Sequence, residues 1–139
     1  MTTVKEVMTA DVRSMGPADS IAAAAKAMSE LNVGVIPVCE GGKLLGVVTD
    51  RDIVIRAVAK GLDGQTPLSG VMSKQVETAS ADDDLDEVLQ RMASGQIRRM
   101  PIVDSSGMLA GIVSIGDIAV KGSEEEADVG QSLGAISAP

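Results

Sequence analysis

The chain has 139 residues, 45% of them hydrophobic, which is about one ordinary domain and enough to build a core without a disulfide or a metal. The formal net charge of −8 and the absence of Phe, Tyr and Trp argue against a nucleic-acid partner, because phosphate backbones attract clustered Lys and Arg and single strands stack on aromatic rings. With no His and one Cys, the sequence offers too few ligands for a zinc site and no Ser-His or Cys-His pair, so it indicates neither a metal site nor a catalytic residue.

No segment of the sequence is suited to cross a membrane. The longest near-continuous apolar run, residues 33–39, is interrupted by Pro37 and is much shorter than the ~20 residues of a membrane span. The first residues lack the apolar segment of a signal peptide, and one cysteine, Cys39, cannot close an internal disulfide. We therefore expect a cytoplasmic protein without a membrane partner, in which Cys39 is either a small buried hydrophobe or a thiol with a redox or intermolecular role.

The first half of the chain begins with a predicted strand, a helix and a further strand. Residues 12–15 are a short strand candidate, and the Pro-Ala-Asp-Ser sequence that follows soon after is typical of a helix start. Apolar residues at helical spacing predict a helix over 20–31 with one buried stripe, and Asn32 ends it. Residues 33–39 are apolar and β-branched, as in a buried strand. Pro37 places that strand at an edge or ends it, because proline has no N–H to donate.

A hairpin and a second helix follow. Residues 40–43 contain two glycines and predict a turn that returns the chain into an antiparallel strand over 44–49. A second helix is expected over 51–60, with Gly61 at its C-terminal end. Its inward-facing residues are expected to be Ile53, Val54, Ala57 and Val58.

The same order of elements occurs twice. Val71-Met72-Ser73 repeats Val7-Met8-Thr9 at an offset of 64 residues (71 − 7), and Pro101 repeats Pro37 at the same offset (101 − 37). A second helix start at 82–84 precedes apolar residues that match those of the first helix. These residues are Leu85, Val88, Leu89 and Met92.

The repeat divides the chain. A turn that is one residue longer, 104–107, raises the offset to 65 (114 − 49), so that Thr49 corresponds to Ser114 and Asp52 to Asp117. We expect a first repeat over 7–61, a linker over 62–70, a second repeat over 71–121 and an acidic, flexible tail over 122–139.

The most informative stretch is the step from the strand 44–49 into the helix that follows. Backbone N–H groups at a helix start have no partner within the helix, so together with the Thr49 hydroxyl they can hold a phosphate. Asp52, one turn later, lies on the same face and can accept hydrogen bonds from a ribose diol. The alternative is that Thr49 or Asp50 only caps the helix and Asp52 complements its dipole. The duplication of the Ser/Thr-x-x-Asp pair favours the binding interpretation.

Two copies that open with Val-Met-Thr/Ser and close with Gly-x-Val-Thr/Ser-x-x-Asp-Ile resemble a pair of cystathionine-β-synthase (CBS) domains, also called a Bateman module. The resemblance covers residues 7–118. Within this family, the chain is similar to stand-alone pairs of the hypoxic response protein type. It implies an α/β (α+β) fold of tandem repeats, each β-α-β-β-α with a small three-stranded sheet, related by a pseudo-twofold axis.

The resemblance also implies a site for an adenosine-containing nucleotide of the AMP, ADP or ATP type, with or without Mg²⁺, in the cleft between the repeats. In this sequence the residues expected to contact ribose and phosphate are Thr49, Asp52, Ser114, Asp117, Arg98, Arg99 and Arg51. The residues expected to line the base pocket are Val12, Ser14, Ile36, Pro37, Val76, Thr78, Met100 and Pro101. At the positions of the two adjacent arginines the first repeat has uncharged residues, Gly34 and Val35, so the two clefts cannot be equivalent for a charged ligand.

Two alternatives stay open. Arg98 and Arg99 are either phosphate ligands, or they are simply solvated or pair with the acidic run 82–86, where exposed ion pairs contribute little. The chain is either a ligand sensor or a ligand-free module that dimerises and docks through the apolar faces at 53–58 and 118–120, with a role in a stress response. In both cases we expect a regulatory homodimer that acts on an unidentified downstream protein and is not an enzyme.

Overall fold

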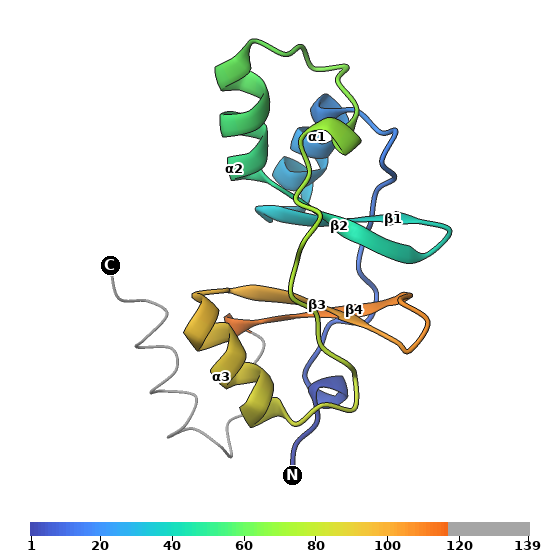
Figure 1. Cartoon of the computed structure of the whole chain (residues 1–139), viewed down its shortest axis with the longest axis vertical. Helices are drawn as coiled ribbons and strands as arrows, with labels where there is room; N and C mark the ends of the chain where they lie inside the picture. The colour runs from blue at the N-terminus through green and yellow to red at the C-terminus, as the bar shows by residue number, and fades with distance from the viewer. Residues whose placement is uncertain (117–139) are drawn as a thin grey trace. The chain divides into compact units, whose positions relative to one another are not determined.

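The computed structural model describes residues 1–116, which fold into two compact units (Figure 1). The first-repeat unit comprises residues 13–76, and the second-repeat unit comprises residues 1–12 together with residues 77–116. Asp117, the apolar residues 118–120 and the expected tail 122–139 lie outside the described residues.

In the first-repeat unit, helix α1 (Ile21–Leu31) precedes a hairpin of β1 (Val35–Glu40) and β2 (Lys43–Thr49). The Ser20 hydroxyl caps α1 by accepting a hydrogen bond from the third helical N–H at 3.1 Å. Asn32 ends α1 in the left-handed conformation, with φ of 55°. The helix over 20–31 and the antiparallel hairpin are thus confirmed.

The helix expected over 51–60 is present, but its geometry changes along its length. A first α-helical turn, α2 (Asp50–Asp52), continues directly into a π-helical segment, η2 (Ile53–Ala57), and a 3₁₀ turn, η3 (Val58–Lys60). Gly61 ends it with φ of +73°, as predicted.

The expected inward face of this helix is partly wrong. Ala57 is fully buried and Ile53 packs against the core, but Val54 and Val58 are 55% and 65% exposed. The π-helical segment contains more residues per turn than an α-helix, so a face drawn at the α-helical period does not stay on one side.

The second-repeat unit repeats this order of elements. It contains a short 3₁₀ turn, η1 (Val4–Glu6), helix α3 (Leu85–Gly95), and a hairpin of β3 (Arg99–Val103) and β4 (Leu109–Ser114). Gln96 ends α3 with φ of 53°, the same left-handed end that closes α1. The predicted core residues of α3 are all buried: Leu85, Val88, Leu89 and Met92.

The strand expected over 12–15 is reduced to one bridge. Met15 donates to the Pro37 carbonyl at 3.0 Å and accepts from Cys39 N–H at 2.8 Å, which makes an isolated parallel bridge with Val38. Met15 is buried, whereas Arg13 and Ser14 are exposed, so one apolar anchor holds this segment.

The segment 76–78, which repeats residues 12–14 at the offset of 64, is likewise not a strand. Ala79, just beyond it, makes a single parallel bridge with Ile102. Each sheet therefore consists of two strands extended by bridges rather than the three strands expected.

Residues 62–70, expected to be a linker, are packed into the first-repeat unit. They contain a 3₁₀ turn, η4 (Leu68–Gly70), whose Leu68 is fully buried. The carbonyls of Thr66 and Gly64 accept hydrogen bonds at 2.9 Å from Ile21 and Ala22, the first two N–H groups of α1. This segment therefore completes the start of α1 rather than only connecting the repeats.

The N-terminal residues do the same in the second-repeat unit. Thr2 accepts a hydrogen bond from Leu85, the first residue of α3, at 2.9 Å, and Val4 is fully buried. Thr9 bridges Ile112 on β4, just as Ser73 bridges Val47 on β2. Each unit is thus completed by the segment that opens the other sequence repeat.

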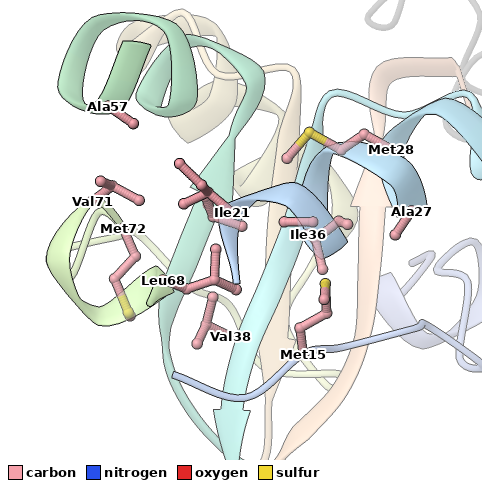
Figure 2. Packing of buried hydrophobic residues seen from close by; sticks show 12 residues of the cluster. Met15, Ile21, Ala27, Met28, Ile36, Val38, Ala57, Leu68, Val71 and Met72 are labelled. Carbon is pink, nitrogen blue, oxygen red and sulfur yellow. The ribbon is translucent and has the colours of Figure 1, made fainter. Parts of the chain in front are cut away.

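Each unit has its own hydrophobic core. In the first-repeat unit the core lies between α1, the hairpin and the segment 68–72 (Figure 2). Figure 2 shows Leu68 near Ile21 and Val38, although Leu68 comes from the expected linker. Burial of such a side chain contributes about 1.5–3 kcal/mol, so this segment adds substantially to the unit's stability.

Candidate functional site

Thr49 and Asp52 form a capping box at the start of α2. The Thr49 hydroxyl oxygen accepts from Asp52 N–H at 2.9 Å, and Asp52 Oδ2 accepts from Thr49 N–H at 3.0 Å. Two N–H groups that a helix start would leave without partners are therefore satisfied. The capping role that the sequence allowed is present in the structure.

Asp52 also binds side chains outside its own helix turn. It is only 7% exposed, and its two carboxylate oxygens each accept from the Ser73 hydroxyl at 3.2 Å. Arg56 Nε lies 3.6 Å from Asp52 Oδ1, and an Arg56 terminal N–H donates to the Met72 carbonyl at 3.3 Å. These partners compensate the burial of a charge. Asp52 thereby ties the start of the helix to residues 72–73.

This cluster limits how a ligand could use Asp52. An ionised carboxylate has about four lone-pair directions, and the Thr49 N–H and the Ser73 hydroxyl use part of them. A ribose diol would bind to the remaining acceptor sites or take the place of Ser73. The carboxylate is therefore both a structural group and a possible ligand contact.

Ser73 and Arg56 were not among the residues singled out from the sequence. Ser73 ends the repeated Val-Met-Ser triplet, and Arg56 follows Asp52 by four residues, the spacing of a helical ion pair. Both signals are present in the sequence, but neither indicates that the two side chains meet at one carboxylate.

The second-repeat unit has the same junction between strand and helix. Ser114 ends β4, and Ile115 N–H donates to the Arg98 carbonyl at 3.0 Å. Asp50 N–H donates to the Gly34 carbonyl, also at 3.0 Å, in the first-repeat unit. Asp117, the expected partner of Ser114, lies outside the described residues.

Arg98 and Arg99 are exposed at the start of β3, and Arg99 pairs with Ser114 across the hairpin. Within residues 1–116 the ion pairs are Arg56–Asp52 and Arg91–Glu77. Neither of these two ion pairs contains Arg98 or Arg99, so both interpretations of the two arginines, as phosphate ligands or as solvated side chains, stay predictions.

The expected base-pocket residues divide into two groups. Pro37 and Pro101 are buried on β1 and β3, and beside them Ile36 and Met100 are 1% and 0% exposed within the two cores. Their side chains are core residues, so an adenine could reach these positions only through the strand backbone. The other expected residues are exposed or half-buried: Val12, Ser14, Val76 and Thr78. They lie near the two points at which the chain passes from one unit to the other.

Arg51 is exposed beside the first-repeat junction. It lines an open surface hollow together with Asp50, Val54 and Ile55. One positive side chain, one negative side chain and two aliphatic side chains therefore line the same hollow.

Two broader features of residues 1–116 bear on function. No helix in this range is long and apolar enough to span a membrane. Nor does this range place three or more His, Cys, Asp or Glu side chains where they could hold a metal ion together.

The sequence matches the family model described as CBS domain over residues 4–58 and again over residues 68–123. CBS domain-containing protein YhcV of Bacillus subtilis is 46% identical over 137 residues, which are 99% of this chain and 96% of that protein. Hypoxic response protein 1 of Mycobacterium tuberculosis is 38% identical over 121 residues, which are 86% of this chain and 84% of that protein.

The solved structures agree with this assignment. The CBS domain pair of protein MJ0100, in complex with 5′-methylthioadenosine and S-adenosyl-L-methionine, is similar with a TM-score of 0.74 and 30% sequence identity. The match covers 85% of this chain and 97% of that chain, so the tandem α/β fold expected from the sequence is confirmed. The two hairpin-and-helix units, the duplicated motif and the matches over both repeats show that the chain belongs to the CBS domain family, as a tandem pair.

Proposed function

We propose that this CBS pair is a regulatory module that binds an adenosine-containing nucleotide, with its ribose and phosphate at the strand-to-helix junctions. The observation that carries the proposal is the repeated junction, where Thr49 and Asp52 in the first repeat correspond to Ser114 and Asp117 in the second. Two exposed arginines, Arg98 and Arg99, supply donors suited to a phosphate at the second junction.

The comparison with MJ0100 supports the ligand class. That CBS pair, 30% identical to this chain, was solved with two adenosine derivatives. An AMP, ADP or ATP type of ligand, with or without Mg²⁺, is the member of this class that fits the two arginines best. By likeness to hypoxic response protein 1, 38% identical, we also propose a cytoplasmic role in a stress response, through a downstream protein.

Isothermal titration with AMP, ADP and ATP tests the proposal. The Asp52→Ala/Asp117→Ala double variant should lose measurable binding, because hydrogen bonds from a ligand to a charged group contribute about 1.5–3 kcal/mol each. Asp52→Ala also removes a helix cap, so Ser20→Ala, which removes the cap of α1, is the matched control and should bind as the wild type does. Unchanged titration heat in the double variant would refute the assignment.

The composition provides a second, independent measurement. The chain has no Phe, Tyr or Trp, so the purified protein should absorb very little in the near ultraviolet. Any adenine nucleotide that stays bound through purification would dominate the spectrum and could be identified by mass after denaturation.

A specific observation also supports a homodimer. Val54, Ile55 and Val58 are 55%, 51% and 65% exposed on one helix, which is unusual for side chains that gain about 1.5–3 kcal/mol on burial. We propose that this face packs against a second copy of the chain. Val54→Asp/Val58→Asp should sediment as a monomer where the wild type sediments as a dimer. A wild-type monomer at micromolar concentration would contradict this.

A further inference from the structure

The two junctions have the same backbone geometry but carry different charges. In each unit the first N–H after the junction donates to a carbonyl just before the hairpin's first strand, at 3.0 Å in both cases. The strand registers agree as well, because Thr49 pairs with Val35 and Ser114 pairs with Arg99. The equivalent positions are therefore Gly34 and Arg98, Val35 and Arg99, Asp50 and Ile115, and Arg51 and Gly116.

The carboxylate of Asp50 occupies the space beside Gly34. A Cβ atom built on Gly34 would lie 3.1 Å from Asp50 Oδ2 and 3.3 Å from its Cγ. At the equivalent position of the second-repeat unit, a side chain does leave the backbone, namely that of Arg98. The first junction thus has a carboxylate where the second has the base of an arginine side chain.

The charges of the two junctions differ accordingly. At the first junction the negative charge of Asp50 offsets the positive charge of Arg51, which lines the same hollow. At the second junction Arg98 and Arg99 are both positive, and the residues equivalent to Asp50 and Arg51 are uncharged. A carboxylate next to a phosphate raises the free energy of the bound phosphate, because both groups are negative. A guanidinium without a carboxylate beside it lowers that free energy.

We propose that Asp50 determines ligand specificity and that the two junctions bind different classes of adenosine derivative. The second junction takes a nucleotide with a phosphate. The first takes a derivative without a phosphate, either a neutral nucleoside or a positively charged sulfonium, whose charge Asp50 tolerates. This proposal rests on the proposed function and narrows it, since both junctions still bind adenosine derivatives but the phosphate is restricted to the second.

Titrations of the wild-type chain with AMP and with adenosine test it. AMP should bind with a stoichiometry of one per chain, and adenosine should still bind after saturation with AMP. S-adenosylmethionine should compete with adenosine but not with AMP.

The decisive variant transplants the second junction onto the first. Gly34→Arg alone would clash with the Asp50 carboxylate, so the variant is Gly34→Arg/Asp50→Ile, which also removes that carboxylate. Its AMP stoichiometry should rise to two per chain. Glu30→Gln, which removes one exposed negative charge from α1, is the matched control and should leave the stoichiometry at one.

The reverse transplant tests the second junction. Arg98→Gly/Arg99→Val should weaken AMP binding at least ~10-fold and leave adenosine binding at the first junction unchanged. Wild-type protein that binds two AMP molecules with equal affinity would overturn the division of ligands while leaving the proposed function intact. Wild-type protein that binds none of the three probes would overturn both.

Discussion

Asp52 is a buried carboxylate whose partners come from three directions. The Thr49 N–H, the Ser73 hydroxyl and the Arg56 guanidinium all approach it, and it is only 7% exposed. Removing one partner leaves the charge less compensated, and hydrogen bonds to charged groups are worth more than neutral ones. The structural role of this residue is therefore measurable apart from any ligand.

Ser73→Ala should lower the free energy of unfolding by about 1–3 kcal/mol, because it removes a hydroxyl that donates to the buried Asp52 carboxylate. Urea unfolding followed by circular dichroism measures the change. Ser105→Ala, in the exposed turn between β3 and β4, should stay within ~0.5 kcal/mol of the wild type. Equal effects of the two substitutions would show that Ser73 contributes nothing at this site.

Cys39 is the chain's one thiol, and burial raises its pKa from the ordinary value of 9.0, while a hydrogen bond with Ser14 lowers it in part. The thiol should therefore react slowly with a disulfide reagent at neutral pH, and Ser14→Ala should slow the reaction further. The pKa of the Cys39 thiol is thus higher in the folded than in the unfolded protein. Its contribution to stability is therefore complete below the unfolded pKa and is lost as the pH rises through the folded pKa. Reaction as fast in the native as in the urea-unfolded protein would contradict this and would favour the redox interpretation.

At the scale of elements, the strongly periodic segments are the ones that the sequence predicted best. The buried residues of α3 match the predicted set because an unbroken α-helix keeps its period over the whole segment. The helix after β2 does not keep that period, and Val54 and Val58 are exposed for this reason. The strand at 12–15 reduced to a bridge because one apolar residue, Met15, anchors it.

Gly46 on β2 and Gly111 on β4 allow the bridging segments to approach the hairpins. A Cβ on Gly46 would overlap the Ser73 carbonyl oxygen, and one on Gly111 would lie 2.6 Å from the Thr9 carbonyl oxygen. Gly46→Ala and Gly111→Ala should each destabilise the protein by about 1–3 kcal/mol, because backbone must move to relieve the overlap.

The matched control for both is Gly70→Ala in η4. A Cβ there would make only an ordinary contact, 4.0 Å from a Thr66 methyl carbon, and should change the thermal midpoint little. If the Gly46→Ala and Gly111→Ala variants had the thermal midpoint of the wild type, glycine would not be required at these two strand positions.

At the scale of the whole molecule, the sequence repeats and the compact units are offset from each other. The sequence pattern predicts repeats over 7–61 and 71–121, but residues 62–76 pack with the first-repeat unit and residues 1–12 with the second. An internal duplication reveals which segments are equivalent, not which copy they pack against. The candidate site was limited in the same way: the motif identified Thr49 and Asp52, but the link to Ser73 comes from a segment of the other repeat.

The offset predicts how fragments behave. A fragment of residues 13–76 contains Leu68, Val71 and Met72, which are 0%, 0% and 5% exposed in the first core, whereas a fragment of residues 7–61 lacks all three. The fragment 7–61 also lacks the Thr66 and Gly64 carbonyls, which accept hydrogen bonds from the first two N–H groups of α1. The fragment 13–76 should unfold cooperatively in urea, and the fragment 7–61 should show no transition.

The same argument applies within the full chain, where Leu68→Ala should cost about 2–5 kcal/mol because it leaves a cavity in the first core. Leu62→Ala, in the same segment but with a side chain that is 43% exposed, is the matched control and should cost much less. If the fragment 7–61 unfolded with the midpoint of 13–76, or if the two leucine variants were equally stable, residues 62–76 would be a linker after all. The segment that opens the second repeat would then only connect the two repeats. The hydrogen bond between Ser73 and Asp52 would not contribute to the stability of the first-repeat unit.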